Sequence, residues 1–310
     1  MSRFPFPLPF GWFHVGYSDQ LSNGQIDAVH YFDKDLILWR DEEGAAHLHD
    51  AYCPHLGAHI GVGGKVKGKL VECPFHHWRY GGDGNVAEVD YAKRMNEKAC
   101  LRTYPTQEHY GVIMAWYHPD GVAPMFDLPA VPEAEDAEWV GPFSNAHSLR
   151  TALQEMAENT ADSAHFVTIH QHPADAEYGD FRFEGPSMIM RSTQHFPSSG
   201  GTVEGTLGTD TYGFGYSVTR YQTLIDVCMV GTNVALDDDR CEQHFHIYYK
   251  NPERDEKIDR IGQAFVTEVN RQFGEDVPIW ENKVYRVAPQ LCDGDGPIAK
   301  FRKWADQFYA

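Results

Sequence analysis

The sequence of 310 residues has little of several features that mark other classes of protein. Its 26 Lys and Arg face 45 Asp and Glu, which gives a net charge of −19. This balance disfavours a nucleic-acid partner and an anionic membrane surface, because both bind basic faces. No stretch approaches the roughly 20 apolar residues of a membrane-spanning helix. With no secretory signal and only six cysteines, we expect a cytoplasmic protein with reduced thiols.

What is present indicates a globular α+β protein with a sizeable core, since 42% of the residues are hydrophobic and 13% aromatic. Residues 1–118 are predicted to form an all-β domain, and residues 119–138, rich in Pro and acidic residues, a linker. Residues 139–310 are predicted to form a larger domain with strands between two helices, at 148–166 and 255–276. The clearest predicted strands of the first domain are 26–32, 35–41, 69–75 and 110–118.

Two short loops in the first domain each offer one thiolate and one imidazole. Cys53 and His55 lie in the first loop, and Cys73 and His76 lie in the second. Two Cys and two His suit a tetrahedral structural zinc or a Rieske [2Fe–2S] cluster. A zinc site usually takes paired cysteines and paired histidines, whereas one of each per loop suits a cluster with two unlike irons. His77 lies next to His76, but the spacing favours His76 as the ligand.

A second group of metal-binding residue types lies in the larger domain, at Asp162, His165 and His170. Asp162 and His165 are three residues apart, so we expect them to share a helix face. Two histidines and one carboxylate can hold a mononuclear iron and leave positions open for O2. His172 is an alternative to His170. The spacing does not reveal which of the chain's acidic residues completes such a site.

The segment from Asp50 to Gly84 resembles the Rieske domain of Rieske non-haem iron oxygenases. Within that family it is most similar to the steroid-acting group, which contains the oxygenase component of 3-ketosteroid 9α-hydroxylase and the cholesterol 7-desaturases. The resemblance extends loosely over most of the chain. It implies an N-terminal all-β Rieske [2Fe–2S] domain and a C-terminal catalytic domain of the helix-grip (START-like) type, with an antiparallel sheet.

The resemblance also assigns roles to single residues of the second domain. It implies that His165 and His170 are ligands of a mononuclear Fe(II), and that Asn159 lies near the iron. It implies that Asp162 is not a ligand but connects His165 to a cluster histidine of a neighbouring subunit. The third ligand implied is Asp276, which lies three residues before Ile-Trp. The other candidates for this ligand are Glu275, Asp293 and Asp295.

These features predict the terminal oxygenase component of a Rieske monooxygenase. We expect it to hydroxylate a steroid or another bulky, hydrophobic polycyclic substrate with O2. The sequence shows no convincing nicotinamide or flavin motif, so electrons should come from a separate ferredoxin- or flavin-type reductase. The family resemblance implies a homotrimer.

Several alternatives stay open at this point. Within the family they are a sterol desaturase and a ring-hydroxylating dioxygenase or demethylase acting on a smaller aromatic substrate. Outside it they are a non-catalytic Rieske electron-transfer protein and a zinc-stapled binding domain.

Overall fold

The computed structural model describes residues 3–172, 177–198 and 201–310, and the chain divides into two compact units. Residues 12–125 form one unit, while residues 126–310 form the other together with the N-terminal residues up to Gly11. The first residues of the chain therefore group with the second unit. The domain boundaries drawn from the sequence, at residues 118 and 138, stay a prediction.

The unit of residues 12–125 consists of strands, turns and loops, and no helix occurs in this fully described range. Its strands make a three-stranded sheet in the order β1-β11-β10 and two four-stranded sheets in the orders β2-β3-β4-β9 and β5-β6-β7-β8. The strands are β1 (Gly11–Tyr17), β2 (Ile26–Tyr31), β3 (Lys34–Arg40), β4 (Ala46–Asp50), β5 (Lys65–Lys67), β6 (Leu70–Glu72), β7 (Arg79–Tyr80), β8 (Val86–Glu88), β9 (Thr103–Tyr104), β10 (Thr106–His109) and β11 (Val112–Tyr117).

The predicted strands of this unit are confirmed as β2, β3, β6 and β11. Every residue of β11 is buried, and so are the last five residues of β3. Such short, continuous apolar runs suit strands that are covered on both faces. The all-β character expected from the sequence therefore follows from runs that are too short for a helix and too apolar for a loop.

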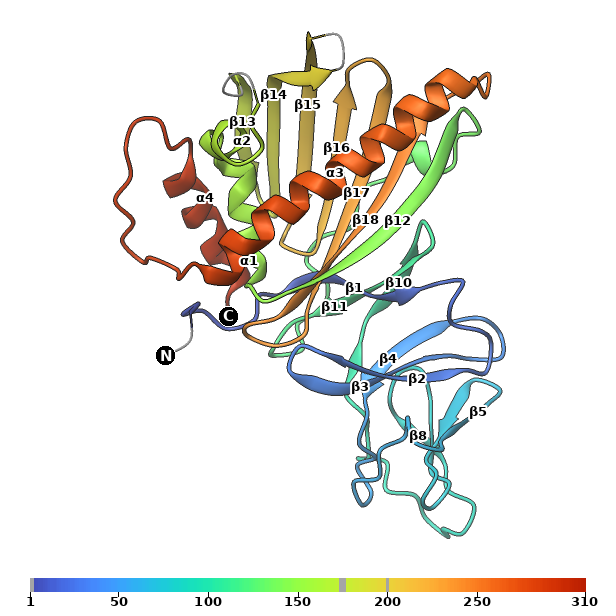
Figure 1. The fold of residues 1–310 in the computed structure, drawn as a ribbon. Coiled ribbons are helices and arrows are strands. Elements are labelled where there is room, and N and C mark those ends of the chain that lie inside the picture. Colours follow the sequence, from blue (N-terminus) through green and yellow to red (C-terminus); the bar gives the residue numbers. More distant parts are fainter. Residues whose placement is uncertain (1–2, 173–176, 199–200) are drawn as a thin grey trace. The chain divides into compact units, whose positions relative to one another are not determined.

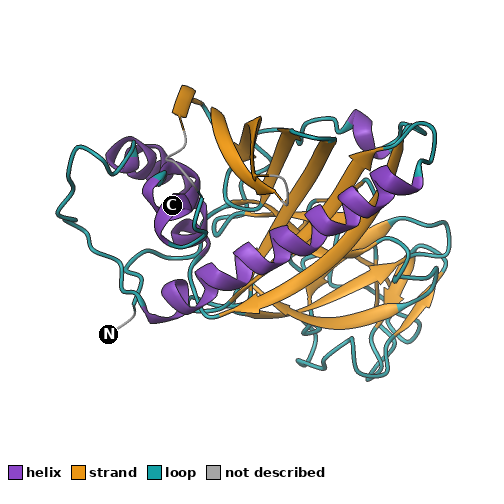
Figure 2. Ribbon diagram, turned by 45° about the horizontal axis from the view of Figure 1, so that its top comes forward, coloured by secondary structure: helices purple, strands orange, loops and turns teal. Residues whose placement is uncertain are grey.

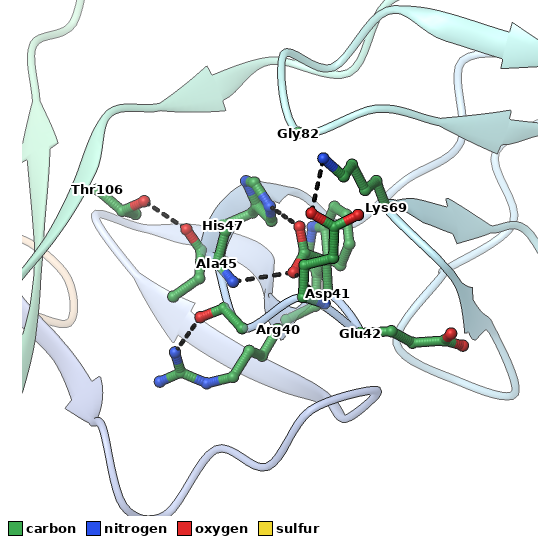
Figure 3. Close-up of polar contacts among 12 residues, drawn as sticks. Arg40, Asp41, Glu42, Ala45, His47, Lys69, Gly82 and Thr106 are labelled. Atoms are coloured by element: carbon green, nitrogen blue, oxygen red, sulfur yellow. Dashed lines mark hydrogen bonds and ion pairs between the residues drawn. The ribbon is translucent and has the colours of Figure 1, made fainter.

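A tight turn joins β3 to β4 and is fixed by the buried side chain of Asp41 (Figure 3). One carboxylate oxygen of Asp41 accepts hydrogen bonds from the backbone N–H groups of Glu43 and Ala45, each at 2.9 Å. The other oxygen lies 3.4 Å from Nε2 of His47. A Cβ atom at Gly82 would lie 2.2 Å from the ring of His47, so only glycine fits there. This packing ties the turn to the loop that follows β7.

The second unit is built on one antiparallel sheet of seven strands in the order β12-β18-β17-β16-β15-β14-β13 (Figure 1). The long helix α3 (Glu256–Asn282) runs along one side of this sheet (Figure 2). A Cβ atom at Gly262 would lie 2.4 Å from the ring of Tyr249, so the absent side chain lets α3 pack closely on β18. The strands are β12 (Trp139–Leu149), β13 (Glu177–Glu184), β14 (Ser187–Ser198), β15 (Gly201–Tyr212), β16 (Tyr216–Gln222), β17 (Asp226–Ala235) and β18 (Cys241–Lys250).

This sheet with its long helix confirms the expected α+β fold with a helix-grip second domain. The remaining helical segments of the unit are short, and no helix within the described residues is long and apolar enough to cross a membrane. They are η1 (Pro132–Ala134), α1 (Leu153–Glu158), η2 (Asn159–Ala161), α2 (Ala164–Thr168), α4 (Ile298–Ala305) and η3 (Asp306–Phe308).

The helix predicted over residues 148–166 is wrong as a continuous element. Leu149 ends β12, and the helical part divides into α1, η2 and α2. The break lies at Asp162, whose backbone is extended, with φ −104° and ψ 103°. Its carboxylate accepts a hydrogen bond from the N–H of Ala164 at 3.1 Å, a local contact that competes with helix formation. Asp162 and His165 therefore do not share a helix face.

The predicted end of the long helix is also corrected. The sequence places Asp276 at a helix C-terminus, whereas α3 continues through Pro278 to Asn282. The start of the helix is close to the prediction, because the side chain of Asp255 caps it by accepting from the N–H groups of Lys257 and Ile258. Asp276 is thus held on a rigid helical turn rather than at a fraying end.

Candidate functional site

The two cysteine loops of the first unit have the same backbone design. The N–H of Gly57 donates to the carbonyl of Cys53 at 2.9 Å, and the N–H of His77 donates to the carbonyl of Cys73 at 3.1 Å. Both donors have left-handed backbones, with φ of +77° at Gly57 and +57° at His77. The side chain of His77 is exposed, whereas both cysteines are 2% exposed and free of a disulfide. Each loop therefore presents one buried sulfur beside one histidine.

The two candidate histidines of these loops lie side by side. The ring centroids of His55 and His76 are 4.8 Å apart, and His55 stacks on Trp78 at 4.4 Å. The Nδ1 atom of His76 is buried and has no hydrogen-bond partner. An unpartnered buried nitrogen is costly in a protein interior, and a metal ion is one of the partners that removes the cost. The residues present therefore fit a cluster held by two sulfurs and two imidazole nitrogens.

Tyr80 is a further group at these loops, and its place in the sequence gives no sign of its role. Its hydroxyl oxygen lies 3.1 Å from Sγ of Cys53, and its side chain is fully buried. Burial raises the pKa of Tyr80 far above its ordinary value, and the neighbouring Cys53 raises it further. Burial likewise raises the pKa of the Cys73 thiol. Tyr80 keeps its proton, so it is a permanent hydrogen-bond donor for a thiolate at Cys53.

In the second unit the structure brings His165, His170 and Asp276 together. One ligand atom from each lies within 4.8 Å of the others, and no other such group of three occurs among the described residues. His165 lies on α2, His170 lies in the loop after it, and Asp276 lies on α3. The Nε2 atom of His170 is 3.4 Å from Oδ2 of Asp276. Two helical segments and one loop thus converge on one point.

Both histidines of this group present the same nitrogen to that point. Nδ1 of His165 lies 2.6 Å from the carbonyl oxygen of Asp162, which can only accept, so this nitrogen carries the proton. Nδ1 of His170 lies 3.1 Å from Oε2 of Glu275. Hydrogen bonds at Nδ1 leave Nε2 as the free electron-pair donor, which is the usual state of a metal-ligating histidine. The donor set therefore fits a divalent metal ion.

The net pKa shifts of the two imidazoles have opposite directions, because burial and the neighbouring carboxylates oppose each other and a different one prevails at each ring. Burial lowers the pKa of His165, and the nearby carboxylates of Asp276 and Asp162 only partly offset this effect. Burial also acts to lower the pKa of His170, but the hydrogen bonds to Asp276 and Glu275 outweigh it and raise the pKa. A proton on His170 takes the place that a cation takes between the imidazole and Asp276.

The remaining acidic candidates lie outside this group of three. Glu275 is on the opposite edge of the His170 ring from Asp276. Asp295 accepts a hydrogen bond from the N–H of Cys292 in the C-terminal segment, and Asp293 is an exposed residue of the same segment.

The other residues singled out from the sequence have separate contacts. His172 is buried, with Nε2 3.4 Å from the amide nitrogen of Gln272. Asn159 accepts a hydrogen bond from the indole N–H of Trp280 at 3.3 Å. Asp162 contacts His165 through its backbone carbonyl rather than its carboxylate.

Comparison with known proteins shows to which protein family the chain with this geometry belongs. The family model of the 3-ketosteroid 9alpha-hydroxylase C-terminal domain matches residues 115–309, and that of the Rieske [2Fe-2S] domain matches residues 11–105. A 3-ketosteroid-9-alpha-monooxygenase oxygenase component of Rhodococcus rhodochrous is 31% identical over 319 residues, covering 96% of this chain and 82% of that protein. Cholesterol 7-desaturase of Caenorhabditis elegans is 31% identical over 339 residues, covering 97% of this chain and 77% of that protein.

This chain belongs to the Rieske oxygenases of the 3-ketosteroid 9α-hydroxylase group. It is an enzyme, an oxygenase component whose cofactors are a [2Fe–2S] cluster and a mononuclear iron. A component of this kind depends on a separate reductase. The recognition made from the cysteine and histidine loops is confirmed.

Solved structures support the fold of this Rieske oxygenase. Dicamba monooxygenase bound to dicamba has a TM-score of 0.74 at 15% identity and covers 98% of both chains. NdmA of Pseudomonas putida CBB5 with caffeine has a TM-score of 0.73 at 17% identity, covering 95% of this chain and 89% of that one. At such identities the likeness shows the shared architecture alone.

A cavity adjoins the His165, His170 and Asp276 group of the oxygenase. The ligand-type residues come from α2, the loop after it and α3, while most of the remaining lining comes from strands β14 to β18. No Lys or Arg of the described chain lines the cavity, and Asp276 is its one acidic lining residue. Its apolar lining includes Met190, Leu207, Met229, Phe245, Phe273 and Trp280. The sequence assigned no substrate contact to any of these six residues, because neither alternation along a strand nor the apolar period of a helix shows which side chains enclose a cavity.

Proposed function

We propose that this Rieske oxygenase hydroxylates a neutral, hydrophobic polycyclic substrate of the steroid class. In this proposal Cys53, His55, Cys73 and His76 hold the [2Fe–2S] cluster. The mononuclear iron is held by His165, His170 and Asp276. The observation that carries the proposal is the convergence of two imidazoles and one buried carboxylate on a cavity whose other lining residues carry no charge and are a mixture of apolar and neutral polar side chains. Two histidines and one carboxylate are the set that non-haem iron oxygenases use.

The lining of the cavity supports a neutral substrate. A substrate carboxylate placed there would meet no cationic side chain among the described lining residues, and an unpaired buried charge is strongly unfavourable. The relatives named for 3-ketosteroids and for cholesterol point to the same class of molecule. Desaturation of a sterol is the second candidate, because a desaturase of the family is as similar to this chain as a hydroxylase is.

The chain's own residues contribute binding, orientation and exclusion of water. The hydrogen bonds at Nδ1 of His165 and His170 fix both rings and both tautomers. The apolar side chains of the cavity hold the substrate and displace solvent from it. When bound, the iron supplies O2 activation, and the cluster supplies electrons one at a time from a ferredoxin- or flavin-type reductase.

The proposed working form is a homotrimer arranged head to tail, in a ring closed by threefold symmetry. Apolar side chains exposed on or near the cluster loops include Leu56 at 65%, Phe75 at 60% and Tyr91 at 62%. Exposed apolar side chains around a redox centre suit a protein interface. In such a ring Asp162 would connect His165 of one subunit to a cluster histidine of the next, His76. A cytoplasmic location, expected from the composition, belongs to the proposal as well.

The testing experiment measures product mass after turnover with a generic reductase, NADH and a panel of 3-ketosteroids and sterols. A gain of one oxygen atom supports hydroxylation, while a loss of two hydrogen atoms supports desaturation. A steroid that carries an added carboxylate is the matched control and should not turn over. If only anionic or small aromatic substrates are converted, the proposed substrate class is wrong. Three irons per chain, two in the cluster and one mononuclear, are expected in the isolated protein.

A further inference from the structure

His170 is held at both ring nitrogens by consecutive residues of one helix. Its Nδ1 atom lies 3.1 Å from Oε2 of Glu275, and its Nε2 atom lies 3.4 Å from Oδ2 of Asp276. Consecutive residues of a helix point about 100° apart and rarely share a partner. An imidazole can satisfy both because its two nitrogens are on different edges of the ring. The His170 side chain is 3% exposed, so the ring has little freedom to leave this position.

The carboxylate of Glu275 is itself held in place from one helical turn earlier. Arg271 forms an ion pair with Glu275 and a second, two-point contact with Glu268 at 2.6 and 2.8 Å. All three residues lie on α3, the helix that also carries Asp276. The position of Glu275 relative to Asp276 is therefore set by helix geometry and by Arg271.

The two histidines of the site differ in what holds them. His165 donates to a neutral backbone carbonyl, whereas His170 faces an ionised side chain. A carboxylate acceptor makes the imidazole a stronger electron-pair donor than a carbonyl does, and it fixes the ring by a charge-assisted hydrogen bond. The oxygens of Glu275 are directed to Nδ1 of His170 and to Arg271, away from the point where the three ligand atoms converge.

We propose that Glu275 is a positioning residue for the mononuclear iron site. It accepts the Nδ1–H of His170, fixes the tautomer with Nε2 toward the iron, and strengthens that ligand. The inference rests on the proposed assignment of His170 and Asp276 as ligands. It separates two adjacent acids that look alike in the sequence, since Asp276 binds the metal and Glu275 orients the opposing histidine.

The test uses the full chain with both cofactors and three variants. Glu275→Ala removes the acceptor, and Glu275→Gln keeps an oxygen that can accept from Nδ1. Glu268→Gln is the matched control, because it alters the other carboxylate partner of Arg271 without contacting His170. The far-ultraviolet circular dichroism spectrum and its thermal melt show whether each variant is folded, including the second unit that carries the substitutions. The readouts are the loss of mononuclear iron to a chelator and the electron paramagnetic resonance spectrum of the ferrous site with nitric oxide.

Glu275→Ala is expected to weaken iron binding by roughly 10- to 100-fold and to change the spectrum. Glu275→Gln should restore most of the affinity, and Glu268→Gln should match the parent protein. Parent-like affinity and spectrum in Glu275→Ala would overturn the positioning role, as would equal losses in Glu275→Ala and Glu268→Gln. A parent protein that binds only the two cluster irons would instead overturn the proposed iron site, and this inference with it.

Discussion

The hydrogen bond from Tyr80 to Cys53 should raise the reduction potential of the [2Fe–2S] cluster. Tyr80 is fully buried and keeps its proton, so its hydroxyl donates to the cysteine sulfur 3.1 Å away. Reduction adds one negative charge to the cluster, and a donor aimed at a sulfur stabilises the more negative state. Tyr80→Phe removes this donor and leaves the aromatic ring in place.

The size of the effect follows from the strength of such a bond. A hydrogen bond to a charged acceptor contributes about 1.5–3 kcal/mol. If about 1.4 kcal/mol of that is gained on reduction, the potential of a one-electron couple changes by about 59 mV. We therefore expect Tyr80→Phe to lower the potential of the cluster by about 60 mV.

A redox titration of the purified chain, followed by visible circular dichroism of the cluster, measures this change. Tyr91→Phe is the control, because the Tyr91 hydroxyl hydrogen-bonds to the indole N–H of Trp78 at 2.8 Å rather than to a cysteine sulfur. An unchanged potential in Tyr80→Phe, with the cluster spectrum intact, would refute the reasoning. A shift of equal size in Tyr91→Phe would show that the potential follows the general polarity of the region.

Three further predictions follow from the structure. Asp162→Ala should keep both metals but lose coupled turnover, as measured by product formed per NADH consumed; normal coupling would contradict the bridging role. Burial lowers the pKa of His49 to about 4, so its contribution to stability should fall as the pH drops from about 6.5 toward 4. Between pH 7 and pH 5 the parent should therefore lose about 2 kcal/mol more unfolding free energy than the His49→Gln variant, measured by denaturant titration. Equal losses in the two proteins would contradict the lowered pKa of His49. Gly262→Ala should cost about 1–3 kcal/mol of stability by overpacking against Tyr249, lowering the melting temperature in calorimetry; an unchanged melting temperature would show that the ring can move aside.

The candidate cluster ligands were the residues that the sequence alone predicted most clearly. A cluster needs each loop to present its ligands at a fixed spacing, so Cys53, His55, Cys73 and His76 stand out without knowledge of the fold. Their roles as ligands stay a prediction. The structure places the sulfur of Cys53 beside that of Cys73 and the ring of His55 beside that of His76.

The spacing of residues did not identify the carboxylate of the second site, and only the family resemblance indicated Asp276 rather than Glu275. Glu275 and Asp276 are adjacent acids with the same chemistry, and only the three-dimensional structure shows them on different edges of the His170 ring. The same limit applies to Tyr80, because a tyrosine in a short strand gives no signal of the sulfur that it contacts.

The helical part was predicted less well than the strands of the first unit. The apolar period through Leu153 and Met156 indicates a helix correctly, but the break at Asp162 depends on one local hydrogen bond that periodicity does not register. Helix α4 and strand β12 were missed. β12 lies at the edge of the sheet and its side chains are mostly half-buried or exposed, so it carries no strong apolar alternation.

The residues proposed to bind iron and most of the cavity wall come from different elements of the fold. The ligand-type residues sit on α2, α3 and the loop between α2 and β13, whereas strands β14 to β18 supply much of the wall. A mutation on a strand can therefore reshape the cavity without moving the histidines or the carboxylate. This separation lets substrate preference diverge by small steps while the oxidative chemistry is inherited intact. The strand residues that line the cavity are therefore the positions to mutate when the enzyme is to be redirected to new substrates.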